Sequence, residues 1–150
     1  HHLGFICANA GVDHSNVGPE KDLVLRLPAD PDESAQRLRA RLRELTGAAP
    51  AIIINDSHGR PWREGTAGVV IGLAGLAPLQ DLRGQPDLFG TPLQITTVGF
   101  ADQIAAAASL VMGQANEGLP AVLVRGLPYQ PAEDVSAQHI LRPPETDLFR

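Results

Sequence analysis

Hydrophobic and polar residues recur with a helical period in two stretches of the chain. The clearer stretch spans residues 31–46, and its apolar positions form one stripe, made of Ala35, Leu38, Leu42 and Leu45. Asp30 can cap this helix, Pro31 suits its first position, and Gly47 is a natural left-handed terminator. The second stretch, residues 97–112, is dense in alanine, so its small side chains would let another element approach closely. We expect a helix at both places.

Short apolar runs predict the strands. Runs rich in β-branched residues fit strands that are buried on both faces, and they occupy residues 51–55, 69–73 and 121–125. Residues 4–11 are predicted to form a further strand that runs into a tight turn, and we expect upstream residues to complete that part of the domain. Residues 128–150 are rich in proline and charge, and we expect this tail to wrap the domain surface or to lead to a further domain.

Composition narrows the class of protein. The 150 residues suffice for one domain, and 43% hydrophobic residues is ordinary for a soluble globular chain. The formal charge of 12 − 17 = −5 argues against a general nucleic-acid binder, although local arginines or metal ions could still hold anionic small substrates. No apolar run reaches the roughly 18 residues that would span a bilayer. The single cysteine, Cys7, excludes an intrachain disulfide, fits a reducing cytosol, and is expected to be a small buried hydrophobe.

Oxygen-bearing side chains crowd the predicted turn after the first strand. Asp13, Ser15 and Asn16 bring together a carboxylate, a hydroxyl and an amide. Such hard oxygen ligands are the ones that Mg²⁺ or Mn²⁺ prefers. The alternative is an Asx-turn, in which Asp13 and Asn16 satisfy local backbone groups.

A second polar segment follows the apolar run at residues 51–55. Asp56 lies at the expected end of a buried strand, and Asp56 and Ser57 side by side could share a metal–phosphate site. Arg60 and Arg63 suit a phosphate or a carboxylate, because guanidinium offers bidentate donors. The alternative is a solvated polar turn in which Trp62 anchors the packing.

Two further loops carry polar groups without a decisive pattern. Residues 112–118 follow the alanine-rich helix, and a helix C-cap with a surface loop explains them. Asp81 and Arg83 can pair with each other, which would make their loop structural. The histidines, including His58, are expected to be polar surface groups. The sequence has no Walker-type glycine loop, no dinucleotide-binding fingerprint, no zinc spacing and no nucleophile elbow.

Taken in order, these segments resemble one family, the coenzyme F420-0:L-glutamate ligases. The resemblance covers nearly all of residues 4–127. The matching stretches are Cys7–Asp13, Ser15–Val17, Leu27–Pro28, Asp30–Asp32, Ser34–Ala35, Asp56–Ser57, Gly59–Arg63, Ile71–Gly72, Ala74–Gly75, Pro78–Leu79, Asp81, Arg83–Gly84, Asp87, Ala101–Asp102, Met112–Gln114 and Val124–Gly126.

The resemblance implies a reaction and its cofactors. The γ-phosphoryl group of GTP would activate the terminal carboxylate of coenzyme F420-0 as an acyl phosphate, which the amine of L-glutamate would then attack to give an amide. Two divalent ions, Mg²⁺ or Mn²⁺, would neutralise phosphate charge, with K⁺ as a further candidate ion.

The resemblance also implies roles for particular residues. Asp13 and Asp56 look like ligands of the first metal, and Ser57 and Gln114 like ligands of the second. Asn16 looks like a nucleotide contact, as does a stretch made of Met112, Gly113, Gln114, Ala115, Asn116, Glu117, Gly118 and Leu119. Arg60 and Arg63 are our candidates for catalytic contact with an anionic group. Two positions depart from the family pattern: Ser57 replaces the commoner threonine but keeps the hydroxyl, and Gln103 stands where an acidic residue is expected.

The fold expected from the resemblance is α+β, with mixed, largely antiparallel sheets and helices packed on their faces, in an intertwined homodimer. Residues 1–127 would be a ligase domain that lacks the N-terminal portion of the family domain, and residues 128–150 a tail or linker toward a nitroreductase-like domain. We expect no nucleic-acid or membrane partner, and a cytoplasmic location. Two alternatives stay open: a non-catalytic nucleotide- or metal-binding or assembly fragment of the family, and an amide ligase acting on another carboxylate.

Overall fold

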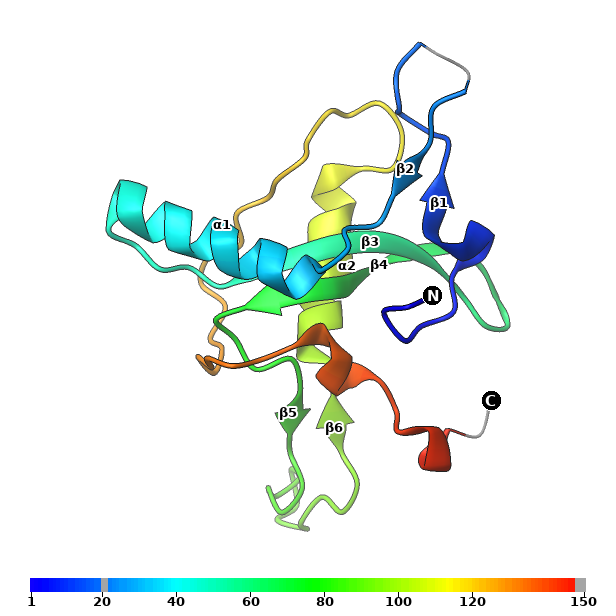
Figure 1. Cartoon of the computed structure of the whole chain (residues 1–150). Helices are drawn as coiled ribbons and strands as arrows, with labels where there is room; N and C mark the ends of the chain where they lie inside the picture. The colour runs from blue at the N-terminus through cyan, green and yellow to red at the C-terminus, as the bar shows by residue number, and fades with distance from the viewer. Residues whose placement is uncertain (20–21, 148–150) are drawn as a thin grey trace.

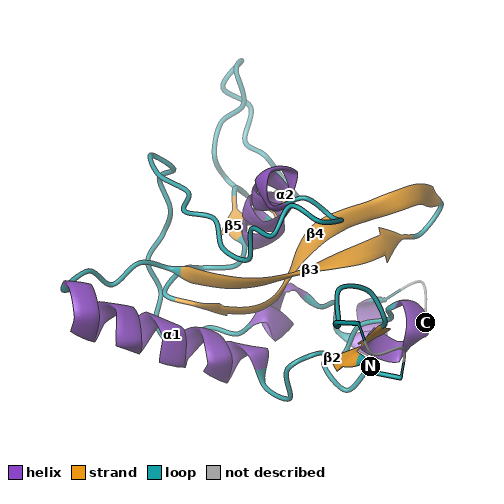
Figure 2. Cartoon of the chain, turned by 90° about the horizontal axis from the view of Figure 1, so that it is seen from above, coloured by secondary structure: helices purple, strands orange, loops and turns teal. Residues whose placement is uncertain are grey.

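One long antiparallel hairpin forms the middle layer of the protein. The computed structural model describes residues 1–19 and 22–147. Strand β3 (Ile52–Arg60) pairs with β4 (Arg63–Ala74), and the turn between them lies far from the helices' centre (Figure 1). Helix α1 (Pro31–Thr46) covers one face of the hairpin and α2 (Phe100–Met112) covers the other, which is clearest in Figure 2. The described sheets are all antiparallel, so the predicted α+β class is confirmed.

Local sequence signals fix the ends of α1. The side chain of Asp30 accepts a hydrogen bond from the Glu33 N–H at 2.8 Å, which satisfies one of the free donors of the first turn. Gly47 follows with a left-handed backbone (φ 73°) and donates to the Arg43 carbonyl at 2.9 Å. The helix therefore spans the predicted residues. Of its predicted apolar stripe, the described residues bury only Ala35. Leu38, Leu42 and Leu45 are exposed.

Two glycines of β4 let the helices approach the hairpin. A Cβ at Gly68 would lie 2.6 Å from the carbonyl oxygen of Ala105 in α2, and a Cβ at Gly72 would lie 2.6 Å from the Cβ of Pro31 in α1. Residues four apart in a strand normally share a face. Here the register shifts between Ile54 and Asn55, which leaves Ile71 as an extra residue and reverses the alternation. The bulge therefore turns the two glycines toward opposite helices.

The core fills the space between β4 and α2. Leu73 and Leu76 are fully buried, and Val70, Phe100 and Ala101 pack with them. Ala137 from the tail completes the cluster. The apolar run at the start of β3 is only half-buried, so the prediction of burial on both faces is wrong for that strand and right for residues 70–74 of β4.

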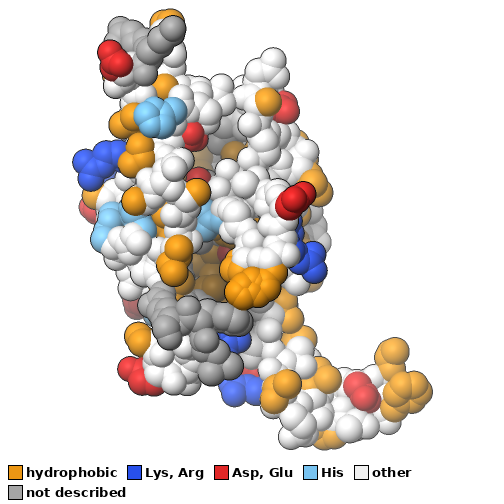
Figure 3. Space-filling view, turned by 90° about the vertical axis from the view of Figure 1, so that its right-hand side faces the viewer, with side chains coloured by type: hydrophobic (Ala, Val, Ile, Leu, Met, Phe, Trp, Pro, Cys, Tyr) orange, Lys and Arg blue, Asp and Glu red, His pale blue; other side chains and the backbone are white. Residues whose placement is uncertain are grey.

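Two small sheets extend from this centre. Strand β1 (Val12–Asp13) pairs with β2 (Leu25–Arg26), and β5 (Gln80–Asp81) pairs with β6 (Thr97–Val98). Residues 82–96 continue the second pair as an arm that extends from the body, and the Asp81–Arg83 pair predicted there is present. The Arg83 guanidinium lowers the pKa of Asp81 to about 2. Figure 3 shows hydrophobic side chains at the end of this arm, where Leu88 and Phe89 are 98% and 93% exposed.

The tail packs on the domain, which is one of its two predicted outcomes. Its 3-10 helices are η2 (Ala137–Ile140) and η3 (Pro144–Thr146). The Asp32 carboxylate, in the first turn of α1, accepts from the Leu73 N–H at 2.9 Å, the Ser136 hydroxyl at 2.6 Å and the Ala137 N–H at 3.1 Å. The partly buried carboxylate of Asp32 thus joins α1, the edge of β4 and the tail. Residues 148–150 of the predicted tail lie outside the described residues.

Several sequence-based expectations are wrong in detail. Residues 4–11 form no strand: Asn9 and Ala10 have left-handed backbones (φ 50° and 52°) within the short 3-10 segment η1 (Ala8–Gly11), and Cys7 is half-buried. Residues 121–125 have no regular structure, because no described strand lies beside them to supply hydrogen-bond partners. The second helix begins at Phe100, since Thr97 and Val98 pair with β5. Neither described α-helix has the length and apolar character needed to cross a membrane.

Replacing either close-approach glycine should destabilise the fold. Gly68→Ala and Gly72→Ala each press a methyl group onto backbone or ring atoms, and overpacking of this kind costs about 1–3 kcal/mol. Gly59→Ala in β3 is the matched control, because nothing lies within 4 Å of its added Cβ, and it should change the free energy of unfolding by less than about 0.5 kcal/mol. Urea unfolding of the protein measures all three. Equal stability of the three variants would contradict this packing.

Candidate functional site

The predicted site residues lie on three segments that are distant in the sequence. They are the turn after β1, the outer half of β3 and the loop that follows α2. The Asn16 side-chain amide donates to the Ala115 carbonyl at 2.9 Å, which joins the first segment to the third across 99 residues. Figure 1 shows the loop after α2, in yellow, arching toward the β1–β2 pair. The two segments predicted to contact a nucleotide are therefore in direct contact.

Asp13 forms the Asx-turn that we weighed as the alternative to a metal ligand. Its Oδ1 accepts from the Ser15 N–H at 2.8 Å, and the Ser15 hydroxyl lies 2.8 Å from Oδ2. The Ser15 backbone hydrogen bond is the largest cause that lowers the pKa of Asp13, so the carboxylate stays ionised well below neutral pH. Asn16 follows with a left-handed backbone (φ 52°) and is exposed. An ionised, exposed carboxylate held by its own turn keeps free lone pairs for a cation.

Asp56 and Ser57 face opposite sides of the hairpin. Successive residues of a strand point to alternate faces, and Ser57 is paired with Gly68, whose missing Cβ would face α2. Asp56 is paired with Val69 and therefore faces the side of α1 and the N-terminal segment. The Asp56 and Ser57 side chains therefore do not point toward one shared ion. The strand places the two residues on different faces, and their assignment to a first and a second ion stays a prediction.

His58 was not predicted to take part in the site, yet its ring lies beside Asp56. Its Nε2 lies 3.0 Å from Asp56 Oδ2, its side chain is only 13% exposed, and its ring lies 4.8 Å from that of Phe5. The expectation of a surface histidine is therefore wrong at this position. The i, i+2 spacing of Asp56 and His58 on one strand face was the signal that could have revealed the pair.

The loop after α2 is shaped by Gly113 and Glu117. Gly113 ends the helix with a backbone (φ 75°) that favours glycine, and a Cβ there would lie 2.5 Å from Glu117 Cγ. Glu117 accepts from the Ala115 N–H at 2.8 Å, and this bond is the largest cause that lowers the pKa of the Glu117 carboxyl. Gln114, Asn116, Gly118 and Leu119 are exposed, while Met112 is half-buried. The loop thus keeps a defined turn while presenting its polar groups to solvent.

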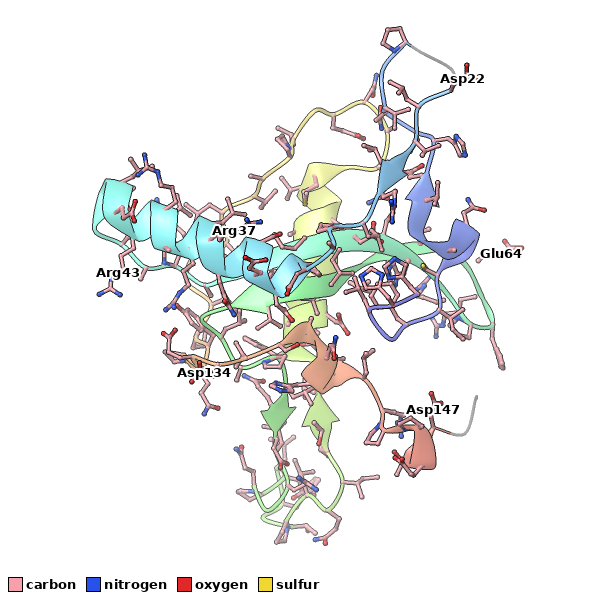
Figure 4. The ribbon with its side chains drawn as sticks, viewed as in Figure 1. Asp22, Arg37, Arg43, Glu64, Asp134 and Asp147 are labelled. Atoms are coloured by element: carbon pink, nitrogen blue, oxygen red, sulfur yellow. The ribbon has the colours of Figure 1, made fainter. Side chains whose placement is uncertain are left out.

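Arg60 and Arg63 lie away from the other predicted residues. They flank the two-residue turn Pro61–Trp62 at the outer end of the hairpin, and Arg60 donates to the Glu64 carbonyl at 2.9 Å. Figure 4 shows Glu64 at this end, pointing away from the body. At the usual rise of a strand, Arg60 is roughly 13 Å along the chain from Asp56. Both arginines are exposed, so no described partner fixes them against the metal-ligand candidates.

The donor chemistry fits hard cations without forming a closed cage. Carboxylates from Asp13 and Asp56, the Ser57 hydroxyl and the Gln114 amide oxygen are all ligand types that Mg²⁺ and Mn²⁺ accept. Within residues 1–19 and 22–147, no three side chains of the types His, Cys, Asp and Glu gather as a metal cluster. That finding agrees with a set that contains only two carboxylates, assisted by neutral oxygens.

One of two grooves in the described structure borders the Asp56 face of β3, and the other lies farther away. One of about 630 Å³ runs beneath the N-terminus of α1 and is lined by His2, Asp32, His58, Asp102 and Gln138, among others. The other, of about 660 Å³, lies between α1 and the tail and includes Arg39 and Glu133, which form a 2.7 Å ion pair. None of the predicted site residues lines either groove. The candidate site is an open surface rather than a cavity.

Comparison with known proteins identifies the origin of this arrangement. The family model described as F420-0:Gamma-glutamyl ligase matches residues 1–126. The chain belongs to the F420-0:gamma-glutamyl ligase family. The resemblance found in the sequence is therefore confirmed.

Individual members of the family match almost the whole chain. It is 52% identical over 148 residues to a coenzyme F420:L-glutamate ligase of Methanothermobacter thermautotrophicus, 51% over 150 residues to that of Methanopyrus kandleri, and 45% over 148 residues to that of Archaeoglobus fulgidus. These alignments cover 98%, 98% and 99% of this chain but 58%, 59% and 58% of the relatives. The chain thus spans a little under three fifths of the length of these F420-0:gamma-glutamyl ligases.

The Glu117–Ala115 hydrogen bond gives the loop of this family member a defined pH response. Because the folded carboxyl has a pKa below its usual 4.5, the stabilisation is fully present above that pH and is lost as the pH falls through the lowered value. NMR titration should give a Glu117 midpoint below 4.5, with the Ala115 amide shift moving at the same pH. In Glu117→Gln the Ala115 amide should not titrate there. A Glu117 midpoint at or above 4.5 would contradict the hydrogen bond.

Proposed function

We propose that the full-length protein containing this chain is a GTP-dependent ligase that adds L-glutamate to coenzyme F420-0 through an acyl-phosphate intermediate. Family membership supports a ligase of F420 and glutamate. The observation that carries the proposal is the Asn16–Ala115 hydrogen bond, because it joins two separate segments that the family resemblance assigns to nucleotide binding. The dependence on GTP and the intermediate are our inference from that resemblance.

In this proposal the chain supplies the oxygen ligands for two divalent ions. Asp13 and Asp56 would hold the first ion, and Ser57 and Gln114 the second, in keeping with the opposite faces of Asp56 and Ser57. When bound, Mg²⁺ or Mn²⁺ neutralises triphosphate charge and polarises the transferring phosphoryl group. His58 lies beside the Asp56 carboxylate, with 3.0 Å between Nε2 and Oδ2. K⁺ remains a further candidate ion.

The loop after α2 would bind the nucleotide chiefly through its backbone. The stretch from Met112 to Leu119 is exposed at Gln114–Leu119, and Gly118 within it has a left-handed backbone (φ 64°) with no atom within 4 Å of the Cβ position. Asn16 would contact the nucleotide beside it. Arg60 and Arg63 would reach an anionic substrate group only from the hairpin tip, so they would act on a distal group such as the carboxylates of L-glutamate or the coenzyme.

Replacing the first-metal ligands tests the ligase proposal. In the full-length protein, Asp13→Ala and Asp56→Ala should each lower glutamate addition to F420-0 by about 100-fold or more, since each removes a charged ligand from the reacting phosphates. Ser57→Thr should retain activity and Ser57→Ala should lose it. Product mass measured with GTP and Mn²⁺ present gives the readout.

The matched control is Asp134→Ala, which removes an exposed carboxylate on the far side of the protein (Figure 4). It should leave turnover within about twofold of the parent, as expected for a surface substitution. Wild-type turnover in either Asp13→Ala or Asp56→Ala would end the metal assignment. Turnover of a different carboxylate in place of F420-0 would favour an amide ligase of another specificity. Nucleotide binding without turnover would favour a non-catalytic fragment.

We also infer that the functional form is a homodimer. The chain exposes 10954 Å² of accessible surface, whereas a compact monomer of 15.9 kDa exposes roughly 7,300 Å². The excess, roughly 3,600 Å² on this one chain, is surface that a second copy and the rest of the full-length protein could cover. Exposed apolar side chains on the arm, the last turns of α1 and α2 and the loop before the tail could supply such an interface, chiefly Leu88, Phe89, Leu45, Leu110 and Leu123. An intertwined arrangement would let each arm cross to its partner.

Light scattering on the full-length protein tests this inference. We expect a mass twice that of one chain, and a shift toward the monomer when Leu88 and Phe89 are both replaced by serine. Gln85→Ser on the same arm is the control and should leave the dimer intact. A monomeric parent protein would refute the homodimer. The cytoplasmic location and a fused or associated nitroreductase-like domain remain part of the same proposal and rest on the family resemblance.

A further inference from the structure

An asparagine beside the predicted metal ligands joins strand β3 to helix α2. Asn55 precedes Asp56 and faces the α2 side of the hairpin, as its pairing with Val70 and its contacts require. Its Nδ2 donates to the Ala105 carbonyl at 3.2 Å and to the Ser109 hydroxyl at 2.9 Å. The same nitrogen lies 3.7 Å from the sulfur of Met112. One side chain therefore contacts three successive turns of the helix.

The site is built around this amide. Gly68 leaves the space that the Asn55 side chain occupies, because a Cβ there would lie 2.9 Å from Asn55 Oδ1. The β-bulge at residues 54–55 directs the side chain toward α2. The Oδ1 atom is buried and has no hydrogen-bond donor among the residues that the structure describes. A half-satisfied buried amide costs free energy that an apolar residue of similar size would not cost. Stability alone therefore does not explain asparagine at this position.

The contact between Asn55 and α2 lies close to the end of the helix, where a small shift of α2 would move the following loop. Met112 is the last residue of α2, and the turn at Gly113 leads directly to Gln114 and Ala115. A helix advances 1.5 Å per residue, so a shift of α2 by one residue would displace Gln114 and rotate it by about 100°. Ala115 in turn accepts from Asn16, beside Asp13. Asn55 thus links the last turns of α2 to β3, and Asn16 links the start of the loop to the β1 turn.

We propose that Asn55 is a positioning residue that sets the distance between Ser57 on β3 and Gln114 on the loop after α2, and that it thereby supports binding of a divalent cation with a nucleoside triphosphate. This inference rests on the proposed function for its ligand and on the hydrogen bonds of Asn55 for its mechanism. Asn55 does not itself contact the ion. Its amide fixes the helix from which the second set of ligands extends.

Equilibrium binding of Mn²⁺ in the presence of GTP, followed by electron paramagnetic resonance, tests the proposal in the full-length protein. Asn55→Ala should raise the Mn²⁺ dissociation constant by about tenfold or more, and hydrogen exchange should become faster at residues 109–116. Ser109→Ala, which removes the shorter acceptor and keeps the Ala105 carbonyl, should give a smaller change in the same direction. It also serves if Asn55→Ala does not fold.

The matched control is Asp102→Asn at the opposite end of α2. Asp102 accepts from the Val70 N–H at 2.9 Å, and asparagine keeps an oxygen acceptor but removes its charge, so this variant weakens the link between α2 and the hairpin and should lower Tm. It should leave the Mn²⁺ dissociation constant within twofold and the exchange of residues 109–116 unchanged. If Asn55→Ala and Ser109→Ala lower Tm but keep the parent affinity for Mn²⁺, the positioning role is overturned and Asn55 is structural.

Failure of the proposed function would look different. A parent protein that binds no Mn²⁺ with GTP would refute the ligase proposal directly. Hydrogen exchange would then decide the inference alone: faster exchange at residues 109–116 in Asn55→Ala, absent from Asp102→Asn, keeps the coupling between β3 and the loop. Unchanged exchange in both variants overturns it.

Discussion

The close approach of two helices to one hairpin is the constraint on which the other features depend. A two-stranded sheet is marginally stable by itself and needs cover on its faces. Here the cover comes from α1 and α2, which reach the backbone because Gly68 and Gly72 have no side chains. The bulge at Ile71 turns these glycines to opposite faces. Without that one extra residue, both gaps would open on the same side, and one helix would meet a fully substituted strand.

The same reversal of alternation determines what the strand presents to solvent and to the loop. Outside the bulge, Asn55 and Ser57 face α2, while Asp56 and His58 face the N-terminal segment. The register of β3 on β4 therefore places the neutral pair, Asn55 and Ser57, on one face and the ionisable pair, Asp56 and His58, on the other. The position of α2 depends on the space left by Gly68, and the position of the loop after α2 depends on that helix. Packing in the centre and the geometry of the candidate ligands are consequences of one backbone irregularity.

Features set by neighbours in sequence could be predicted, and features set by distant neighbours could not. Asp30 and Gly47 act within one turn, so both ends of α1 were predicted correctly. The run at residues 121–125 has the composition of a strand, but a strand also needs a partner, which local sequence does not reveal. Asn9 and Ala10 have left-handed backbones that nothing in their side chains requires.

The candidate site shows the same division. Its residues were identified by family resemblance rather than by spacing, and their metal-binding roles stay predictions. The opposite faces of Asp56 and Ser57 follow from simple alternation, but only once β3 is known to continue to Arg60 instead of ending at residue 55. The Asn16–Ala115 contact joins residues 99 positions apart, beyond the reach of any local pattern. The contacts of Asn55 with α2 were equally hidden, because they depend on which element packs against β3.

The carboxylate of Asp32 has a consequence for synthesis of the protein. It lies at the start of α1, yet its hydroxyl donor, Ser136, is encoded 104 positions later. At usual translation speeds, roughly 5–20 s pass between the appearance of the two residues at the ribosome. During that interval the first turn of α1 and the edge of β4 lack the hydrogen bonds from Ser136 and Ala137. The nascent chain can therefore close this edge only after the whole segment between Asp32 and Ser136 has been synthesised.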